Sequence, residues 1–303
     1  MDDHAPASGH ATTAWAAFAG CSLIWGSTFL VISIGNDALP PLWAVALRLA
    51  LAAALQAAIV AALGQRFPRG AALGAAAGYG FLNMGLSMTL LYWAELSVPS
   101  GLVAVLYGSI PLSTALFARA VGLERLVPLK VAGAVVALAG VTSIVAGRFA
   151  GTLEVLPVLA AVVAATCAAA SGVVLKRGPR QAPLPANAVA SAVGAVVAVT
   201  ASLLAGEPHP LPRTAASLGP VLYLAVAGSL GAFGLYAWLV NHWPVTRISF
   251  ISVVVPVVAL SLGVAFRGER LGRPEVLGAG LVMLGLALAL ASDRLRPLAA
   301  PRP

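Results

Sequence analysis

Ten apolar stretches of about 20 residues, with few charged residues in them, constrain this chain more than any other feature. An α-helix of roughly 20 apolar residues spans the hydrocarbon core of a bilayer, whereas a barrel strand is about half as long and alternates apolar and polar side chains. We therefore predict an all-α integral membrane protein. Its ten transmembrane helices are expected at residues 14–34, 41–63, 70–93, 99–121, 127–147, 153–175, 185–205, 217–240, 245–266 and 274–292.

Charged residues make up only 9% of the chain, and hydrophobic residues make up 60%. A soluble domain has roughly 25% charged residues, so a water-soluble globule is excluded. The net charge of +8 would suggest a nucleic-acid partner in a soluble protein, but here the basic residues lie in short joints between apolar stretches. If the N-terminus is inside, the inner joints and tails hold twelve Lys and Arg and the outer joints hold five. This asymmetry predicts that both termini are cytoplasmic.

A repeat within the chain divides the predicted helices into two sets of five. Several features recur at one offset of 145 residues without a gap: Pro111 and Pro256, Glu124-Arg125-Leu126 and Glu269-Arg270-Leu271, Gly133 and Gly278, Gly140 and Gly285, and Trp93 and Trp238. We expect one domain at residues 14–147 and a second at residues 153–292. Because five is an odd number, the second half must enter the membrane from the opposite side. The two halves are therefore predicted to be inverted repeats.

Inverted repeats are the architecture of secondary transporters, whose two halves rock about a site near the bilayer midplane. The sequence has no paired carboxylates, HExxH motif, Ser-His-Asp set or CxxC motif, and its four histidines are dispersed. A Gly-rich phosphate loop with Lys is also absent. We therefore predict that the chain is not an enzyme and that it binds no metal and no cofactor.

A resemblance to a known family rests on three motifs. These are Trp25-Gly26-Ser27-Thr28-Phe29, Pro40-Pro41 followed by Arg48-Leu49, and the paired blocks in which Pro256 precedes Gly268-Glu269-Arg270-Leu271 and Pro111 precedes Leu123-Glu124-Arg125-Leu126. Together they resemble the EamA domain of the drug/metabolite transporter superfamily, in both halves of the chain. The resemblance implies a ten-helix bacterial exporter of amino acids and related metabolites, of a kind similar to exporters of aromatic amino acids. It also implies that helices one to four and six to nine surround the substrate path, while helices five and ten are peripheral.

Two polar stripes predict which helix faces line a cavity. Tyr79, Asn83 and Ser87 recur every four residues and share one face of a helix. Because polar side chains in contact with lipid are costly, this face is expected to point into the bundle. A second stripe and its counterpart in the repeat are Ser100, Ala104, Tyr107, Pro111 and Thr114, and Val245, Ser249, Ser252, Pro256 and Ala259.

Candidate substrate contacts combine interior aromatic rings with polar groups, a lining that suits small amphipathic solutes. They are Trp25, Tyr79, Asn83, Tyr107, Trp238 and Ser252. Each aromatic ring could equally pack in the core. Pro111 and Pro256 each remove a backbone hydrogen bond and serve either as hinges or as static kinks. Arg48, the only charge well inside a predicted helix, either binds an anionic group of the substrate or has a structural role.

The acidic residues lie outside the middle third of every predicted helix, so an intramembrane carboxylate relay for protons is not expected. Glu124 and Glu269 are instead expected to cap helix ends or to pair with the adjacent arginines. A uniporter, an exchanger, and coupling through His242 or through water all stay open.

The sequence therefore predicts a multi-pass transporter of the bacterial inner (plasma) membrane that exports small metabolites by alternating access. Its expected partners are amino acids, aromatic ones included, and membrane lipids, but no nucleic acid. Two alternatives stay open: efflux of cationic or amphipathic drugs, and a scaffold or lipid-handling protein without a solute pathway. A sealed, dry bundle centre would favour the scaffold, and a midplane cavity would favour transport.

Overall fold

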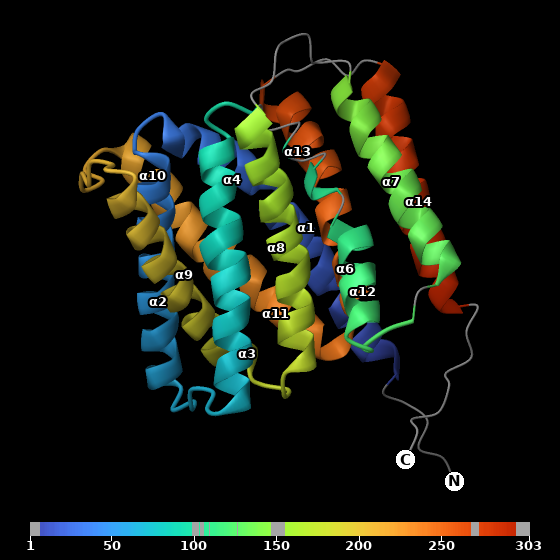
Figure 1. The fold of residues 1–303 in the computed structure, drawn as a ribbon, viewed down its shortest axis with the longest axis horizontal. Helices are drawn as coiled ribbons and strands as arrows, with labels where there is room; N and C mark the ends of the chain where they lie inside the picture. The colour runs from blue at the N-terminus through green and yellow to red at the C-terminus, as the bar shows by residue number, and fades with distance from the viewer. Residues whose placement is uncertain are drawn as a thin grey trace.

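The computed structural model describes residues 7–98, 103, 106–108, 110–125, 127–146, 155–267 and 273–294, and its regular elements there are all helical (Figure 1). In the first half they are α1 (Ala7–Asn36), α2 (Pro41–Ala62), α3 (Ala71–Tyr79), η1 (Gly80–Ser87), α4 (Met88–Ala94), α6 (Ile110–Ala120) and α7 (Pro128–Ala146). In the second half they are α8 (Val155–Arg177), α9 (Pro183–Leu204), α10 (Ala215–Tyr223), η2 (Leu224–Ala232), α11 (Phe233–His242), α12 (Val245–Ile248), α13 (Ile251–Arg267) and α14 (Arg273–Arg294).

Along the described residues these elements group into ten helices, in the order that the apolar stretches predict. Helix three is the continuous segment 71–94, made of α3, η1 and α4, and helix eight is the segment 215–242, made of α10, η2 and α11. Five helices are long and apolar enough to cross a membrane by length and composition: Thr12–Asn36, Pro41–Ala62, Val155–Arg177, Pro183–Leu204 and Ala215–His242. The all-α fold expected from the sequence is therefore present.

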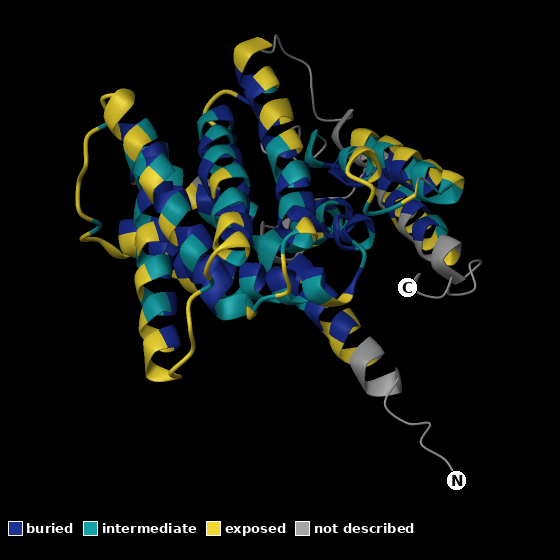
Figure 2. Cartoon of the chain, turned by 60° about the horizontal axis from the view of Figure 1, so that its bottom comes forward, coloured by how far each residue is buried: buried dark blue, intermediate teal, exposed yellow. Residues whose placement is uncertain are grey.

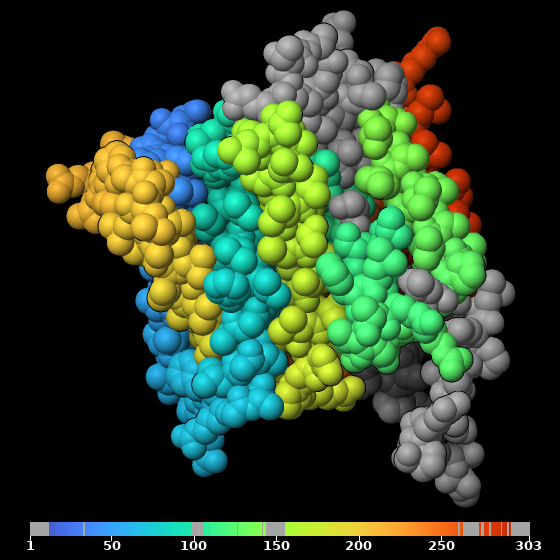
Figure 3. Space-filling model, viewed as in Figure 1, coloured from blue at the N-terminus to red at the C-terminus, as the bar shows by residue number. Residues whose placement is uncertain are grey.

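The helices pack as two halves related by reciprocal contacts. α1 of the first half packs on α13 and η2 of the second, and α8 of the second half packs on α6 and η1 of the first. Corresponding helices of the two halves also pack on each other, α2 on α9 and α7 on α14. One face of this arrangement is visible in Figure 3, where α8 lies between helix three and α6. Reciprocal pairing of this kind is what a two-fold relation between halves requires.

The contact between α7 and α14 shows that the halves are inverted. A Cβ on Gly133 would lie 2.6 Å from the carbonyl oxygen of Gly285, and a Cβ on Gly140 would lie 2.6 Å from that of Gly278. As residue numbers rise along α7 they fall along α14, so these two corresponding helices are antiparallel. The pair forms one edge of the bundle, as Figure 1 shows at the right, which agrees with the peripheral position expected for helices five and ten. Small residues allow this close approach of two backbones.

Apolar side chains cover the outer surfaces of the helices. Val155 of α8 is 72% exposed, Val196 of α9 is 67% exposed and Leu277 of α14 is 67% exposed. Figure 2 shows such exposed residues along the outward faces, while buried residues follow the inward faces. In water an exposed apolar surface of this kind marks an interaction site, and for a bundle of membrane-spanning helices the partner is lipid.

The middle turns of helix three and helix eight have π-helical backbones. η1 covers Gly80–Ser87 and η2 covers Leu224–Ala232. The offset of 145 residues carries η1 onto residues 225–232, so the two π-helices occupy equivalent positions in the two halves. π-helical turns are rare and frequently occur at functional sites. The fold therefore has this unusual backbone at equivalent positions of both halves.

α1 begins and α14 ends at the same end of the bundle, the lower end in Figure 1. This agrees with the expectation that the two ends of the helical region lie on one side. Glu269, Arg270 and Leu271 lie outside the described residues, so the position of the second Glu-Arg-Leu joint stays a prediction.

Candidate functional site

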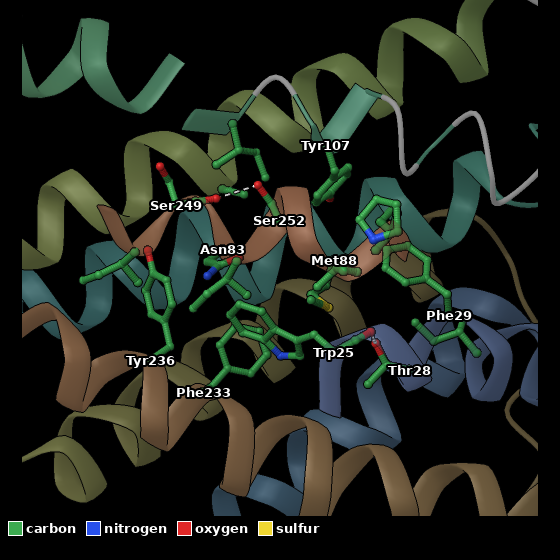
Figure 4. A pocket seen from close by; sticks show the side chains of 18 of the residues that line it. Trp25, Thr28, Phe29, Asn83, Met88, Tyr107, Phe233, Tyr236, Ser249 and Ser252 are labelled. Carbon is green, nitrogen blue, oxygen red and sulfur yellow. Dashed lines mark hydrogen bonds between the residues drawn. The ribbon is translucent and has the colours of Figure 1, made fainter. Parts of the chain in front are cut away.

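A cavity of about 100 Å³ lies between the two halves (Figure 4). Both halves contribute to its wall, through helices one, two, three and four of the first and helices six, eight and nine of the second. The residues that line it are Trp25, Thr28, Phe29, Ile32, Arg48, Asn83, Met88, Leu91, Tyr107, Ile110, Ala168, Phe233, Tyr236, Ile248, Ser249, Ile251, Ser252, Val255 and Pro256. A space of this size holds several water molecules. Side chains therefore do not completely fill the bundle centre.

One wall of the cavity is aromatic. The ring of Trp25 lies 4.9 Å from that of Phe233 in an edge-to-face arrangement at 64°, and 5.5 Å from that of Tyr236. Phe29 extends this wall along α1. The indole Nε1 of Trp25 is buried and has no hydrogen-bond partner among the described residues. Buried indole groups usually find a partner, so this unpaired donor is an exception within the aromatic wall.

Polar groups lie across the cavity from Trp25 and Phe233 in Figure 4. The Ser252 hydroxyl donates to the carbonyl oxygen of Ser249 at 2.7 Å. The hydroxyls of Tyr107 and Ser87 share a hydrogen bond of 2.9 Å, which joins helix four to η1. Asn83 of η1 is 7% exposed and lines the cavity between the two walls. The cavity thus combines apolar rings with a few polar groups, as small-solute sites do.

Arg48 is the only charged residue that lines the cavity among the described residues. Its guanidinium is 1% exposed, with Nε donating to the Ser229 hydroxyl at 2.9 Å and Nη1 donating to the Tyr92 hydroxyl at 3.1 Å. It lies against Gly228, where an added Cβ would be 2.8 Å from Nη2. These contacts hold the head group of Arg48 inside the bundle, so the side chain does not extend to a membrane surface.

A buried polar network holds Ser229, whose hydroxyl accepts the hydrogen bond from Arg48 Nε. The carbonyl oxygen of Ser229 in η2 accepts hydrogen bonds from Asn187 Nδ2 at 2.8 Å and from Gln56 Nε2 at 3.2 Å. The Ser191 hydroxyl donates to Gln56 Oε1 at 3.4 Å. This network joins helices two, seven and eight, and sequence reasoning missed all of it. The available signal was the presence of single amide side chains within otherwise apolar helices.

The structure brings five of the eight predicted site residues together around the cavity. These are Trp25, Asn83, Tyr107, Ser252 and Pro256. Tyr79 is buried behind the wall, where its ring stacks on Tyr236 at 6.0 Å and 12°. Tyr79 and Asn83 are buried, and Tyr107 and Ser252 are half-buried.

Trp238 and Pro111 do not line the cavity. The ring of Trp238 stacks on His242 at 3.9 Å, and Phe233 and Tyr236 hold the aromatic positions that sequence reasoning gave to Trp238. Pro111 is the second residue of α6, where a missing backbone donor costs nothing. Pro256 lies inside α13. The two prolines therefore differ in their helical setting, and their roles as hinges stay a prediction.

Carboxylates lie at the two ends of the pathway. At the lower end in Figure 1, Glu124 accepts hydrogen bonds from the backbone N and from the hydroxyl of Thr246, which links the joint after α6 to the start of α12. Glu95 lies directly beyond the end of α4, close enough to Tyr92 and Tyr107 to interact with both electrostatically. Burial raises the pKa of Glu95 to about 8, so its carboxyl is mostly protonated at pH 7.

The described residues contain no group of three or more His, Cys, Asp or Glu side chains that could hold a metal ion. Both cysteines are free thiols, Cys21 in the core and Cys167 half-buried. The chemistry of the cavity is therefore that of binding through packing, hydrogen bonds and one cation.

Known proteins resemble this chain along nearly its whole length. The EamA-like transporter family matches residues 13–146 and again residues 155–291. The uncharacterized inner membrane transporter YedA of Escherichia coli K12 is 30% identical over 285 residues, which cover 92% of each chain. A probable amino-acid metabolite efflux pump of Salmonella typhimurium is 26% identical over 285 residues, which cover 90% of this chain and 93% of that protein.

A solved crystal structure shares the fold. It superposes with a TM-score of 0.77 over 94% of this chain and 99% of that chain, at 24% sequence identity. The family match falls once on each five-helix half, and the fold places a cavity between two inverted halves. This chain therefore belongs to the EamA-like transporter family and is a membrane transporter, not an enzyme.

Proposed function

We propose that this protein exports amino acids and related small metabolites, aromatic ones included, across the inner membrane by alternating access. The observation that carries the proposal is the cavity between inverted halves, because each half supplies part of its wall. Relative motion of the halves would then expose this one site to either side of the membrane in turn. The location follows that of the related inner membrane transporter YedA.

The lining of the cavity supports an amino-acid-sized, partly apolar solute. Trp25, Phe29, Phe233 and Tyr236 offer aromatic surface, and Asn83 and Ser252 offer polar groups. A relative at 26% identity is named a probable amino-acid metabolite efflux pump, which supports the same substrate class. We propose Trp25, Asn83, Tyr107 and Ser252 as substrate contacts, with Tyr79 and Trp238 acting from the layer behind them.

The Glu124–Thr246 contact would close one end of the pathway. It joins the two halves at the lower end in Figure 1, the end assigned to the cytoplasm by the distribution of Lys and Arg. Opening toward that side would require these two groups to separate. The contact is then broken and re-formed in each transport cycle.

No carboxylate lines the cavity among the described residues, so export down a substrate gradient needs no proton relay there. The test is flux of labelled phenylalanine into proteoliposomes that contain the purified protein, with and without an imposed pH gradient. We expect saturable flux without a pH gradient, absent from protein-free liposomes. Strict dependence on a proton gradient would contradict the facilitator mechanism and direct attention to His242 and Arg48.

Efflux of cationic drugs is the second candidate, and one observation weighs against it. The only charge on the cavity wall among the described residues is the positive charge of Arg48, and like charges repel in a low-dielectric site. Ethidium and phenylalanine supplied to the same proteoliposomes decide between the two substrate classes. Transport of ethidium but not of phenylalanine would replace the amino-acid proposal with drug efflux.

A further inference from the structure

We infer that the free edge of the Arg48 guanidinium binds the carboxylate of the transported solute, so that the site selects carboxylate-bearing molecules. The inference rests on the proposed function and names the chemical group by which the substrate is recognised. It also combines the two roles that the sequence left open for Arg48, because it gives the side chain a structural edge and a binding edge.

Two of the three guanidinium nitrogens are already engaged. Nε donates to Ser229 and Nη1 donates to Tyr92, and both acceptors are neutral hydroxyls. Nη2 has no hydrogen-bond acceptor among the described residues, and it is not among the fully buried atoms that lack a partner. Arg48 is 1% exposed and lines the cavity, and we infer that this unpaired nitrogen lies at the cavity wall. The engaged nitrogens fix the orientation of the guanidinium, which leaves the free edge pre-organised for a ligand.

No carboxylate of the described residues neutralises the charge of Arg48. The described residues place no carboxylate within salt-bridge distance of it and none on the cavity wall. A buried cation whose partners are all neutral is costly, and a carboxylate is the ligand that offsets this cost with a charge-assisted hydrogen bond. The one unused group of the guanidinium, Nη2, is thus a donor, which suits an anionic group.

The space for the guanidinium comes from a difference between the two halves. Gly228 in η2 is the counterpart of Asn83 in η1 under the offset of 145 residues. Because Gly228 has no side chain, the head group of Arg48 lies where an asparagine would otherwise project. Arg48 is also the eighth residue of α2, and the eighth residue of α9 is Ala190. Among the described residues only the first half supplies a cation to the cavity wall, so the carboxylate end of a solute has one preferred orientation in the cavity.

The first test uses the wild-type protein in proteoliposomes and competition against labelled phenylalanine. 3-Phenylpropionate keeps the carboxylate and lacks the amine, whereas phenylalaninamide and phenethylamine lack the carboxylate. A hydrogen bond to a charged group contributes enough that the two carboxylate-free compounds are expected to compete about tenfold more weakly than 3-phenylpropionate. Equal competition by phenylalaninamide and phenylalanine would overturn the inference while leaving amino-acid transport intact.

Variants then assign the preference to Arg48. Arg48→Gln is expected to abolish the difference between the two kinds of competitor, which a purely structural arginine would not do. Gly228→Ala is expected to reduce it, because the new Cβ displaces the flexible end of Arg48 and not the backbone. Arg66→Gln removes an exposed arginine in the joint after α2 and serves as the matched control, with an unchanged preference expected. An undiminished preference in both Arg48→Gln and Gly228→Ala would overturn the assignment.

A binding assay separates this inference from the proposed function. Quenching of intrinsic tryptophan fluorescence by the same four compounds can be measured on the purified protein, because Trp25 borders the cavity. If phenylalanine is not transported but 3-phenylpropionate still binds more tightly than phenethylamine, the transport proposal fails and the carboxylate site stands. If phenethylamine binds as tightly as 3-phenylpropionate, the carboxylate site fails.

Discussion

The two π-helices occupy equivalent positions in the two halves, but they present different residues to the region around the cavity. η1 presents the side chain of Asn83 to the cavity, whereas η2 presents Gly228 and so admits the guanidinium of Arg48 from helix two. The backbone is repeated, and the side chains at matching positions are not. Under the proposed function, the repeated backbone would let the same site open to either side, and the unequal side chains would hold a solute in one orientation.

The contact between α7 and α14 is the opposite case. There the same residue type recurs at both matching positions, and each glycine approaches the backbone of the other half. This contact lies away from the cavity, at the edge of the bundle, so it carries no solute selectivity. Symmetry is therefore kept at the contact between α7 and α14 and is lost where the solute is expected to bind.

The largest expected effect comes from breaking the symmetric contact. Gly133→Ala and Gly140→Ala each place a Cβ 2.6 Å from a carbonyl oxygen of α14, so the helices must move apart. Overpacking of this kind destabilises a fold by about 1–3 kcal/mol, and the two-fold relation predicts similar losses for the two variants. Thermal unfolding of the purified proteins in detergent measures the loss.

Gly74→Ala is the matched control for those two variants, because nothing lies within 4 Å of a Cβ at Gly74 in α3. Alanine in an open helical position is expected to raise stability slightly, by less than about 1 kcal/mol. A destabilisation by Gly133→Ala that greatly exceeds that by Gly140→Ala would show that the contact is not symmetric in the membrane protein.

How far the sequence predicts this molecule depends on the range of the interactions involved. The helices and the repeat follow from local properties, since a bilayer fixes the length of an apolar segment and the motif spacing is read directly. The cavity residues Asn83, Tyr107 and Ser252 follow from the same helical periodicity. The network of Arg48 with Ser229 and Asn187 does not, because its members lie on different helices and share no spacing.

The π-helices explain why some ring positions were not predictable. Tyr79 and Asn83 share one face if each turn holds 3.6 residues, but η1 begins at Gly80 and a π-helical turn holds about one residue more. Asn83 consequently faces the cavity, while Tyr79 packs behind it on Tyr236. Likewise η2 ends directly before the segment that holds Phe233, Tyr236 and Trp238. Phe233 and Tyr236 line the cavity, and Trp238 does not.

A smaller effect is expected from the unequal pair Tyr107 and Ser252, which match under the offset of 145 residues and both line the cavity. Tyr107→Ser makes the two halves alike at this position, enlarges the cavity and removes the hydrogen bond to Ser87. We expect phenylalanine flux to fall by about threefold to tenfold and the preference to move toward the larger tryptophan. Initial rates with both amino acids measure this change.

Trp15→Ala is the control for the Tyr107 variant. Trp15 is 42% exposed and packs against Trp243, away from the cavity wall. Its removal is expected to leave the ratio of phenylalanine to tryptophan flux unchanged. The same ratio in wild type and Tyr107→Ser would return Tyr107 to a packing role.

The smallest expected effect concerns Glu95, whose counterpart in the second half is the buried apolar residue Val240. Burial raises the pKa of Glu95 to about 8 from an ordinary 4.5, so the folded protein holds this proton more tightly than the unfolded chain. The stability that the protonated carboxyl allows is fully present below pH 4.5 and is lost as the pH rises through 8.

We therefore expect Tm to fall by a few degrees between pH 5.5 and about pH 8.5, and expect Glu95→Gln to flatten this dependence. Asp37→Asn, which changes an exposed carboxylate in the joint after α1, is expected to keep the wild-type slope. A slope in Glu95→Gln as steep as in wild type would show that the fold does not require a neutral carboxyl at this position, directly beyond the end of α4.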